Sequence, residues 1–143
     1  MTLIALIPAR GGSKGIPRKN IKSFSGKPLL QWSVECALRA DCFDQVVVST
    51  DDLEIADVAK SCGADVPFLR PSELASDISP GVAPVLHALN CLPHVTDILL
   101  LQPTSPLRSY KHIDSACKKF LSTNSDGYET RYDYIPDEVL YYS

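Results

Sequence analysis

Several features that would identify common protein classes are missing from this 143-residue chain. No apolar run approaches the roughly 18 residues that a membrane-spanning helix needs, and the N-terminus lacks the basic stretch and apolar core of a secretory signal. No pair of the five cysteines has Cys-x-x-Cys spacing, so we expect reduced, structural thiols rather than metal or redox sites. The three histidines show no metal-ligand spacing either, and we expect them to be surface or packing residues. These absences predict a cytoplasmic protein with no membrane partner.

Acidic residues are absent from the first 34 positions, although the whole chain has a net charge of −3. The same stretch contains Arg10, Lys14, Arg18, Lys19, Lys22 and Lys27. A local basic patch within an acidic protein suits a small anionic ligand, whereas a nucleic-acid-binding domain is usually basic throughout. We therefore expect no nucleic-acid partner.

A glycine-rich basic loop, residues 10–20, follows the first apolar run, residues 3–7. Gly11, Gly12 and Gly15 can take positive φ and let a ligand approach the backbone, and successive amide groups in such turns bind anions. The basic side chains suit phosphate oxygens. The loop matches neither the P-loop pattern nor G-x-G-x-x-G. It predicts a nucleotide triphosphate site, with a solvated basic loop as the alternative.

Apolar runs alternate with amphipathic stretches along the chain. Strands are predicted at 3–7, 45–50, 66–69 and 98–102, and helices at 28–40, between 51 and 63, at 82–92 and at 109–121. This alternation predicts an α/β fold of three layers, with helices on both faces of a mostly parallel, Rossmann-like sheet. Ligands on such sheets bind beyond the carboxyl ends of the strands, where residues 10–20, 50–52 and 102–108 all fall.

Two neighbouring acids, Asp51 and Asp52, follow the second predicted strand. A carboxylate pair of this kind could hold a metal ion. Asp51 and Glu54 also match a helix capping box, in which the first residue bonds to the backbone of the helix it precedes. The capping interpretation is sufficient, and we prefer it.

The last stretch, residues 126–143, differs from the rest of the chain. It is acidic and contains five of the six tyrosines. This composition allows either an edge segment of the sheet or disorder. We therefore predict a nucleotide-binding α/β domain at 1–125, followed by a divergent tail at 126–143.

Four stretches, in this order and spacing, resemble the signature of the acylneuraminate cytidylyltransferases, also called CMP-sialic acid synthetases. They are IPARGGSKGIPRKN at 7–20, VSTDD at 48–52, LRP with LASD at 69–77, and LLQPTSPLR at 100–108. The resemblance covers roughly residues 3–122, the N-terminal portion of such a protein. It implies a fold of the nucleotide-diphospho-sugar transferase type, apparently truncated here, because relatives continue with another strand, a dimerisation element and an Asp pair.

The resemblance implies transfer of CMP from CTP to a nine-carbon acidic sugar, with release of pyrophosphate. It assigns catalytic roles to Arg10, Lys14 and Gln102, of which Gln102 would face the sugar. It assigns nucleotide binding to Arg10, Gly11, Gly12, Ser13, Lys14, Lys19, Asn20, Arg70 and Ser79. Asn20 would contact the ribose, and Arg70 and Ser79 would lie near the cytosine.

The residues by themselves leave some of these roles open. Asn20 suits a turn equally well, and Arg70 could be a surface residue before Pro71. Relatives often have a small hydroxyl residue directly after the position of Ser79, where this chain has Pro80. Gln102 is unusual at the end of an apolar run, because a buried amide needs partners, and this favours a functional role.

The resemblance also implies Mg²⁺, which usually holds nucleotide phosphates with one or two carboxylates. The Asp pair expected to bind it would lie beyond the end of this chain, so we expect no metal ligands here. A homodimer is implied as well, although its usual dimerisation element is missing. Two alternatives remain: a truncated CTP- or CDP-binding homologue without turnover, and another sugar nucleotidyltransferase on the same fold.

Overall fold

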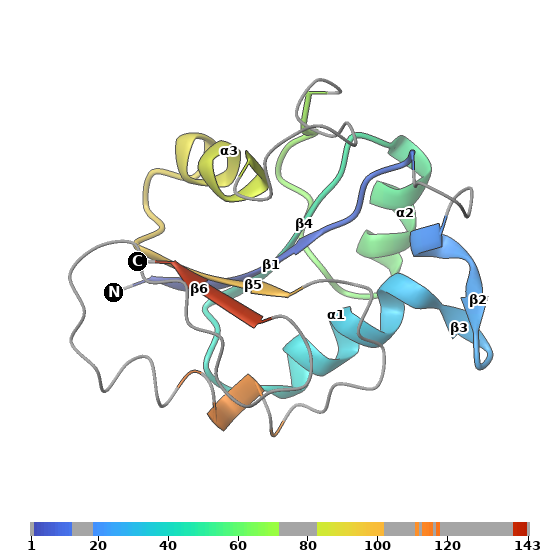
Figure 1. Cartoon of the computed structure of the whole chain (residues 1–143), viewed down its shortest axis with the longest axis horizontal. Helices are drawn as coiled ribbons and strands as arrows, with labels where there is room; N and C mark the ends of the chain where they lie inside the picture. The colour runs from blue at the N-terminus through green and yellow to red at the C-terminus, as the bar shows by residue number, and fades with distance from the viewer. Residues whose placement is uncertain are drawn as a thin grey trace.

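The computed structural model describes residues 2–12, 19–71, 83–101 and 139–142, together with 111, 113–115 and 117. Its elements are β1 (Leu3–Pro8), the 3-10 helix η1 (Lys19–Ile21), β2 (Ser23–Phe24), β3 (Lys27–Pro28), α1 (Leu29–Arg39), β4 (Gln45–Ser49), α2 (Leu53–Ser61), α3 (Ala83–Cys91), β5 (Asp97–Leu101) and β6 (Val139–Tyr142). Residues 111, 113–115 and 117 are also helical. Figure 1 shows a central sheet with helices on both sides.

The main sheet has the strand order β4-β1-β5-β6. β1 pairs in parallel with both neighbours, so that Ala5 lies opposite Val46 on one side and Leu99 on the other. β6 pairs antiparallel with β5. The chain leaves β1 for β4 on one side and then crosses to β5 on the other. Ligands on open α/β sheets bind where the order reverses in this way, at the carboxyl ends of the strands.

β1 is buried on both faces, and its side chains alternate between two cores. Leu3, Ala5 and Ile7 contribute to the core that includes Leu30, Val34 and Ala37 of α1, Ile55 and Ala59 of α2, and Ile113 and Cys117. Ile4 and Leu6 contribute to the opposite core, with Val85 and Ala88 of α3. An unbroken apolar run is what a strand covered on both faces requires. The predicted three-layer α/β fold is confirmed.

The N-terminal cap of α2 is Asp52 and not, as we predicted, Asp51. Asp52 Oδ1 accepts a hydrogen bond from Ile55 N at 3.1 Å. The Asp51 carboxylate is instead engaged across the chain with Gly11. The capping-box prediction is therefore wrong, because a long-range partner holds the first residue of the pattern. The other end of α2 is as expected, since Gly63 follows it with a φ of +101°.

The strand predicted at 66–69 does not form. Asp65 alone makes a β-bridge, to Val47. The chain still runs beside β4, because Asp65 N donates to Val46 O at 2.9 Å and Arg70 N donates to Thr50 O at 2.8 Å. Between these two contacts lies Pro67, which has no backbone N–H to donate to a ladder. The result is an extended segment without regular strand pairing.

The tail contributes a strand, β6, although we expected the chain to end before any further strand. β6 aligns with β5 so that Leu140 lies opposite Leu100. Of our two alternatives for the tail, an edge segment describes residues 139–142. Val, Leu and Tyr are residues that suit a half-buried strand, and the acidic residues that suggested disorder lie before them.

All five cysteines are free thiols. Cys42 and Cys117 hydrogen-bond to each other, which lowers the pKa of the Cys42 thiol and raises that of Cys117. Within the part of the chain that the structure describes, no helix combines the length and the apolar character needed to cross a bilayer.

Candidate functional site

The glycine-rich loop leaves the sheet at the carboxyl end of β1. Ala9 N still donates to Ser49 O at 2.8 Å, so the chain stays beside β4 for one residue beyond the strand. At the far end of the loop, the side chain of Asn20 is 6% exposed and its Nδ2 donates to Arg10 O at 2.9 Å. Asn20 therefore ties the two ends of the loop together.

Gly11 is a position where no side chain fits. A Cβ built there would lie 2.8 Å from Asp52 Oδ2 and 3.0 Å from Asp52 Cβ. Neither Gly11 nor Gly12 has positive φ, because the glycines with positive φ in the described part of the chain are Gly26 and Gly63. Gly12 is exposed, and a Cβ there would meet nothing within 4 Å. Gly11 is thus required for close packing and not for an unusual backbone conformation.

Arg70 is a buried cation, with 5% of its surface exposed. Its Nε has no hydrogen-bond partner. Burial lowers the pKa of the guanidinium, the Asp51 carboxylate raises it, and the charge of Arg10 lowers it. The surface alternative for Arg70 is therefore wrong. A buried charged group with an unpaired donor is costly unless a ligand pairs with it, so this arrangement is typical of a binding site.

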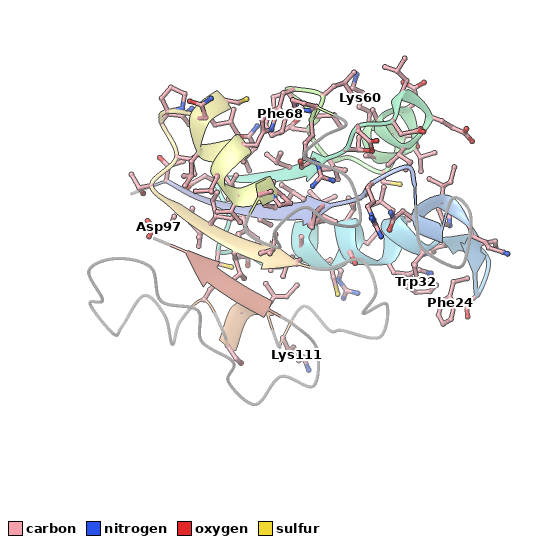
Figure 2. All side chains as sticks on the ribbon, turned by 45° about the horizontal axis from the view of Figure 1, so that its top comes forward. Phe24, Trp32, Lys60, Phe68, Asp97 and Lys111 are labelled. Carbon is pink, nitrogen blue, oxygen red and sulfur yellow. The ribbon has the colours of Figure 1, made fainter. Side chains whose placement is uncertain are left out.

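His87 on α3 lies against the segment that holds Arg70. Its ring meets Phe68 edge-on, with centroids 4.8 Å apart, and Figure 2 shows Phe68 beside α3. Its Nδ1 is buried without a partner, whereas Nε2 lies 3.5 Å from Cys91 Sγ. Burial lowers the pKa of His87, and the charge of Arg70 lowers it further. Nothing in the sequence indicated this neighbour of Arg70, since the contact joins two distant elements.

Several of the predicted site residues meet at the carboxyl ends of β1 and β4. Arg10, Gly11 and Gly12 follow β1, Asn20 closes their loop, and Arg70 is bonded through its backbone to Thr50. For Lys19 the structure gives only the backbone, within η1. The predicted residues Ser13, Lys14, Ser79 and Gln102 lie outside the described residues. The prediction missed Asp51, although its position directly after β4 places it at the same edge as the loop.

The described residues do not supply a metal site. No three His, Cys, Asp or Glu side chains among them converge to hold an ion. The one adjacent pair of acids that suggested such a site is engaged with backbone amides, Asp51 with Gly11 N and Asp52 with Ile55 N. These residues do not fit Mg²⁺.

Curated relatives share sequence with most of this chain. It is 43% identical over 129 residues to a pseudaminic acid cytidylyltransferase of Campylobacter jejuni, a match that covers 87% of this chain and 56% of that protein. It is 43% identical over 120 residues to a CMP-N,N'-diacetyllegionaminic acid synthase of Legionella pneumophila, covering 81% of this chain and 52% of that protein. The chain thus spans about half the length of these relatives.

Solved structures share the fold. A CMP:2-keto-3-deoxy-manno-octonic acid synthetase complexed with CTP superposes with a TM-score of 0.79 at 21% identity, covering 91% of this chain and 52% of that one. A cytidylyltransferase from Leptospira borgpetersenii gives a TM-score of 0.77 at 23% identity, covering all of this chain and 60% of that one. The family model described as "Cytidylyltransferase" matches residues 4–142, well beyond the limit at residue 122 that we inferred from the motifs. The chain belongs to the cytidylyltransferase family.

Proposed function

We propose that this chain transfers CMP from CTP to a nonulosonic acid, with release of pyrophosphate, and that its described residues form part of the nucleotide site. The observation that supports it most is the bond between Asn20 and Arg10 at the carboxyl end of β1, together with the buried cation Arg70, whose backbone is bonded to Thr50 at the end of β4. A closed loop of this kind presents backbone amides and positive charge to an anion. The relatives named above act on pseudaminic and legionaminic acids, which favours an acidic nine-carbon acceptor.

In the proposed reaction, the anomeric hydroxyl of the sugar attacks the α-phosphorus of CTP. One P–O bond forms, the bond to the pyrophosphate oxygen breaks, and the hydroxyl proton is released. Such transfers depend mainly on positioning and on neutralising charge on phosphate oxygens. In our proposal Arg10 and Lys14 carry out the neutralisation, assisted by Ser13, Lys19 and the backbone at Gly12.

The remaining predicted residues orient the two substrates in this proposal. Asn20 contacts the ribose, Arg70 and Ser79 lie near the cytosine, and Gln102 faces the sugar. We further propose Mg²⁺ as the metal, a homodimer as the assembly and the cytoplasm as the location. Bound Mg²⁺ would neutralise phosphate charge, but the described residues do not fit the ion.

The proposal is tested by measuring pyrophosphate release from the purified chain. The assay contains CTP and Mg²⁺ with N-acetylneuraminate, pseudaminate or legionaminate, and each component is omitted in turn. We expect release that requires an acidic sugar and CTP. Calorimetry with CTP identifies a binding module, which would bind CTP without releasing pyrophosphate. Competition by UTP, GTP and ATP identifies a nucleotidyltransferase with a different nucleotide specificity.

Replacement of Lys14 by Ala tests the loop directly. Loss of one preorganised donor to a reacting phosphate typically costs about 10²–10³ in rate, and we expect a loss of this size in kcat for K14A. Lys22 is a matched control, because it is basic, exposed and lies just beyond η1. Equal turnover by K14A and K22A would contradict the assignment of the loop.

A further inference from the structure

Asp51 connects two parts of the proposed nucleotide site. Its Oδ1 accepts a hydrogen bond from Gly11 N at 2.8 Å, across 40 positions of sequence. Capping of α2, the role that we predicted for it, is performed by Asp52. A carboxylate that accepts a backbone N–H makes a charge-assisted bond, which is stronger than one between neutral groups. Asp51 therefore fixes the start of the glycine-rich loop to the end of β4.

The same residue is also connected to Arg70 through its neighbour Thr50. The neighbouring Thr50 accepts Arg70 N at 2.8 Å, which holds the Arg70 backbone next to the end of β4. Burial lowers the pKa of Arg70, and the Asp51 carboxylate is the acid whose charge opposes this effect. Arg10, which precedes Gly11, adds a second positive charge nearby. Asp51 thus bonds to a loop amide, and it follows the residue to which the backbone of the buried Arg70 is bonded.

We propose that Asp51 is a positioning residue that holds the phosphate side and the base side of the nucleotide site at one spacing. The identity of the ligand rests on the function proposed above. Asp51 acts through Gly11 and Arg70, and it does not itself touch the nucleotide. Because the Gly11 amide donates to Asp51, the amide contacts to phosphate begin at Gly12.

Whether loss of Asp51 weakens or strengthens CTP binding distinguishes positioning from simple electrostatic repulsion. Removal of a negative charge from a site that binds an anion strengthens binding if the charge only repels the ligand. The same holds if the Asp51 carboxylate competes with phosphate for the Gly11 amide. Positioning predicts the opposite sign, because the loop and Arg70 lose their common support. Weaker binding of CTP after loss of Asp51 is therefore specific to the proposal.

The experiment is calorimetric titration of CTP into the 143-residue chain carrying Asp51→Ala, Asp51→Asn or Asp57→Ala. Asp57 is exposed on α2 and provides the same change of charge away from the loop. We expect D51A to bind CTP about 10- to 100-fold more weakly, as for loss of a hydrogen bond to a charged group. D51N keeps an acceptor for Gly11 N but loses the charge beside Arg70, so its affinity should lie between D51A and wild type. Tighter binding by both variants overturns the proposal, provided that D57A binds like wild type.

Exchange of the Gly11 amide hydrogen, followed by NMR, tests the geometry without CTP. We expect a slowly exchanging amide in the wild-type chain and in D51N, and a fast one in D51A. A fast Gly11 amide in the wild-type chain overturns the proposal whatever the affinities. Failure of the wild-type chain to bind CTP overturns the proposed function instead, while an amide protected by Asp51 still supports the positioning role. If D51A does not fold, the CTP affinity of D51N and the exchange rate of the Gly11 amide in the wild-type chain test the proposal.

Discussion

At the scale of single residues, the site contains buried polar atoms that have no hydrogen-bond partner. Arg70 is buried with an unpaired Nε, and His87 lies nearby with an unpaired Nδ1. The family resemblance pointed to Arg70, whereas His87 looked ordinary in the sequence, within a helical pattern. The edge-on contact of His87 with Phe68 packs α3 against the segment that runs beside β4. Two buried groups with unused hydrogen-bonding capacity favour a ligand over pure packing.

The lowered pKa of His87 predicts how stability depends on pH. The folded pKa lies below the unfolded value of about 6.5, because burial and Arg70 disfavour the charged ring. Between these two pKa values the unfolded chain binds more protons than the folded chain. The contribution of His87 is therefore fully present above the unfolded pKa and is lost as the pH falls toward the folded pKa.

Urea unfolding of the wild-type chain and of His87→Gln, over roughly pH 5 to 8, measures this contribution. We expect the wild-type chain to lose more stability than H87Q below pH 6.5. His94→Gln is the matched control, because His94 is exposed. Parallel pH profiles for wild type and H87Q would show that His87 titrates alike in both states.

At the scale of elements, the apolar pattern of the sequence was sufficient to predict a strand or helix wherever any apolar neighbour can provide the packing contact. The continuous runs at β1, β4 and β5 and the amphipathic faces of α1 and α2 were all predicted within a few residues. Predictions failed where one specific residue decides. Pro67 interrupts the pairing beside β4, and the distant Gly11 amide takes the carboxylate that a capping box would use. Local patterns contain no information about partners 40 positions away.

The contact between the glycine-rich loop and α2 supports a prediction about a pair of glycines. In Gly11→Ala, the new methyl group meets the Asp52 side chain at 2.8 Å, so either the loop or the cap of α2 must move. Loss of a helix cap costs about 1 kcal/mol, and we expect G11A to lower the free energy of unfolding by this amount and to weaken CTP binding.

Gly12→Ala is the internal control for G11A. No atom lies within 4 Å of its new methyl group, and Gly12 has no positive φ. G12A should therefore unfold in urea like the wild-type chain. If G11A and G12A have equal stability, the Gly11 position does not require close packing against Asp52, and the glycines act only on the ligand.

At the scale of the whole molecule, one sheet contains both β1, from the first residues of the sequence, and β6, from the last. β5 is fully buried, and β6 occupies its side away from β1. We divided the chain into a domain at 1–125 and a separate tail, and this division stays a prediction. The pairing of β6 with β5 makes it testable, because a separable tail could be removed without effect on the sheet.

We expect removal of residues 126–143 to destabilise the chain and to cause self-association. Without β6, the backbone N–H and C=O groups along the outer edge of β5 lose their partners, and an apolar strand edge without a neighbour pairs readily with another chain. Urea unfolding measures the first effect, and sedimentation velocity over a range of concentrations measures the second.

Leu140→Pro in the full chain is the matched control for length and charge, because proline removes one strand amide and leaves the acidic residues in place. Self-association of both variants would assign the effect to the open edge of β5. A monomeric 1–125 chain as stable as the full chain would instead establish the tail as a separate unit, so that the sheet and the proposed nucleotide site do not depend on β6.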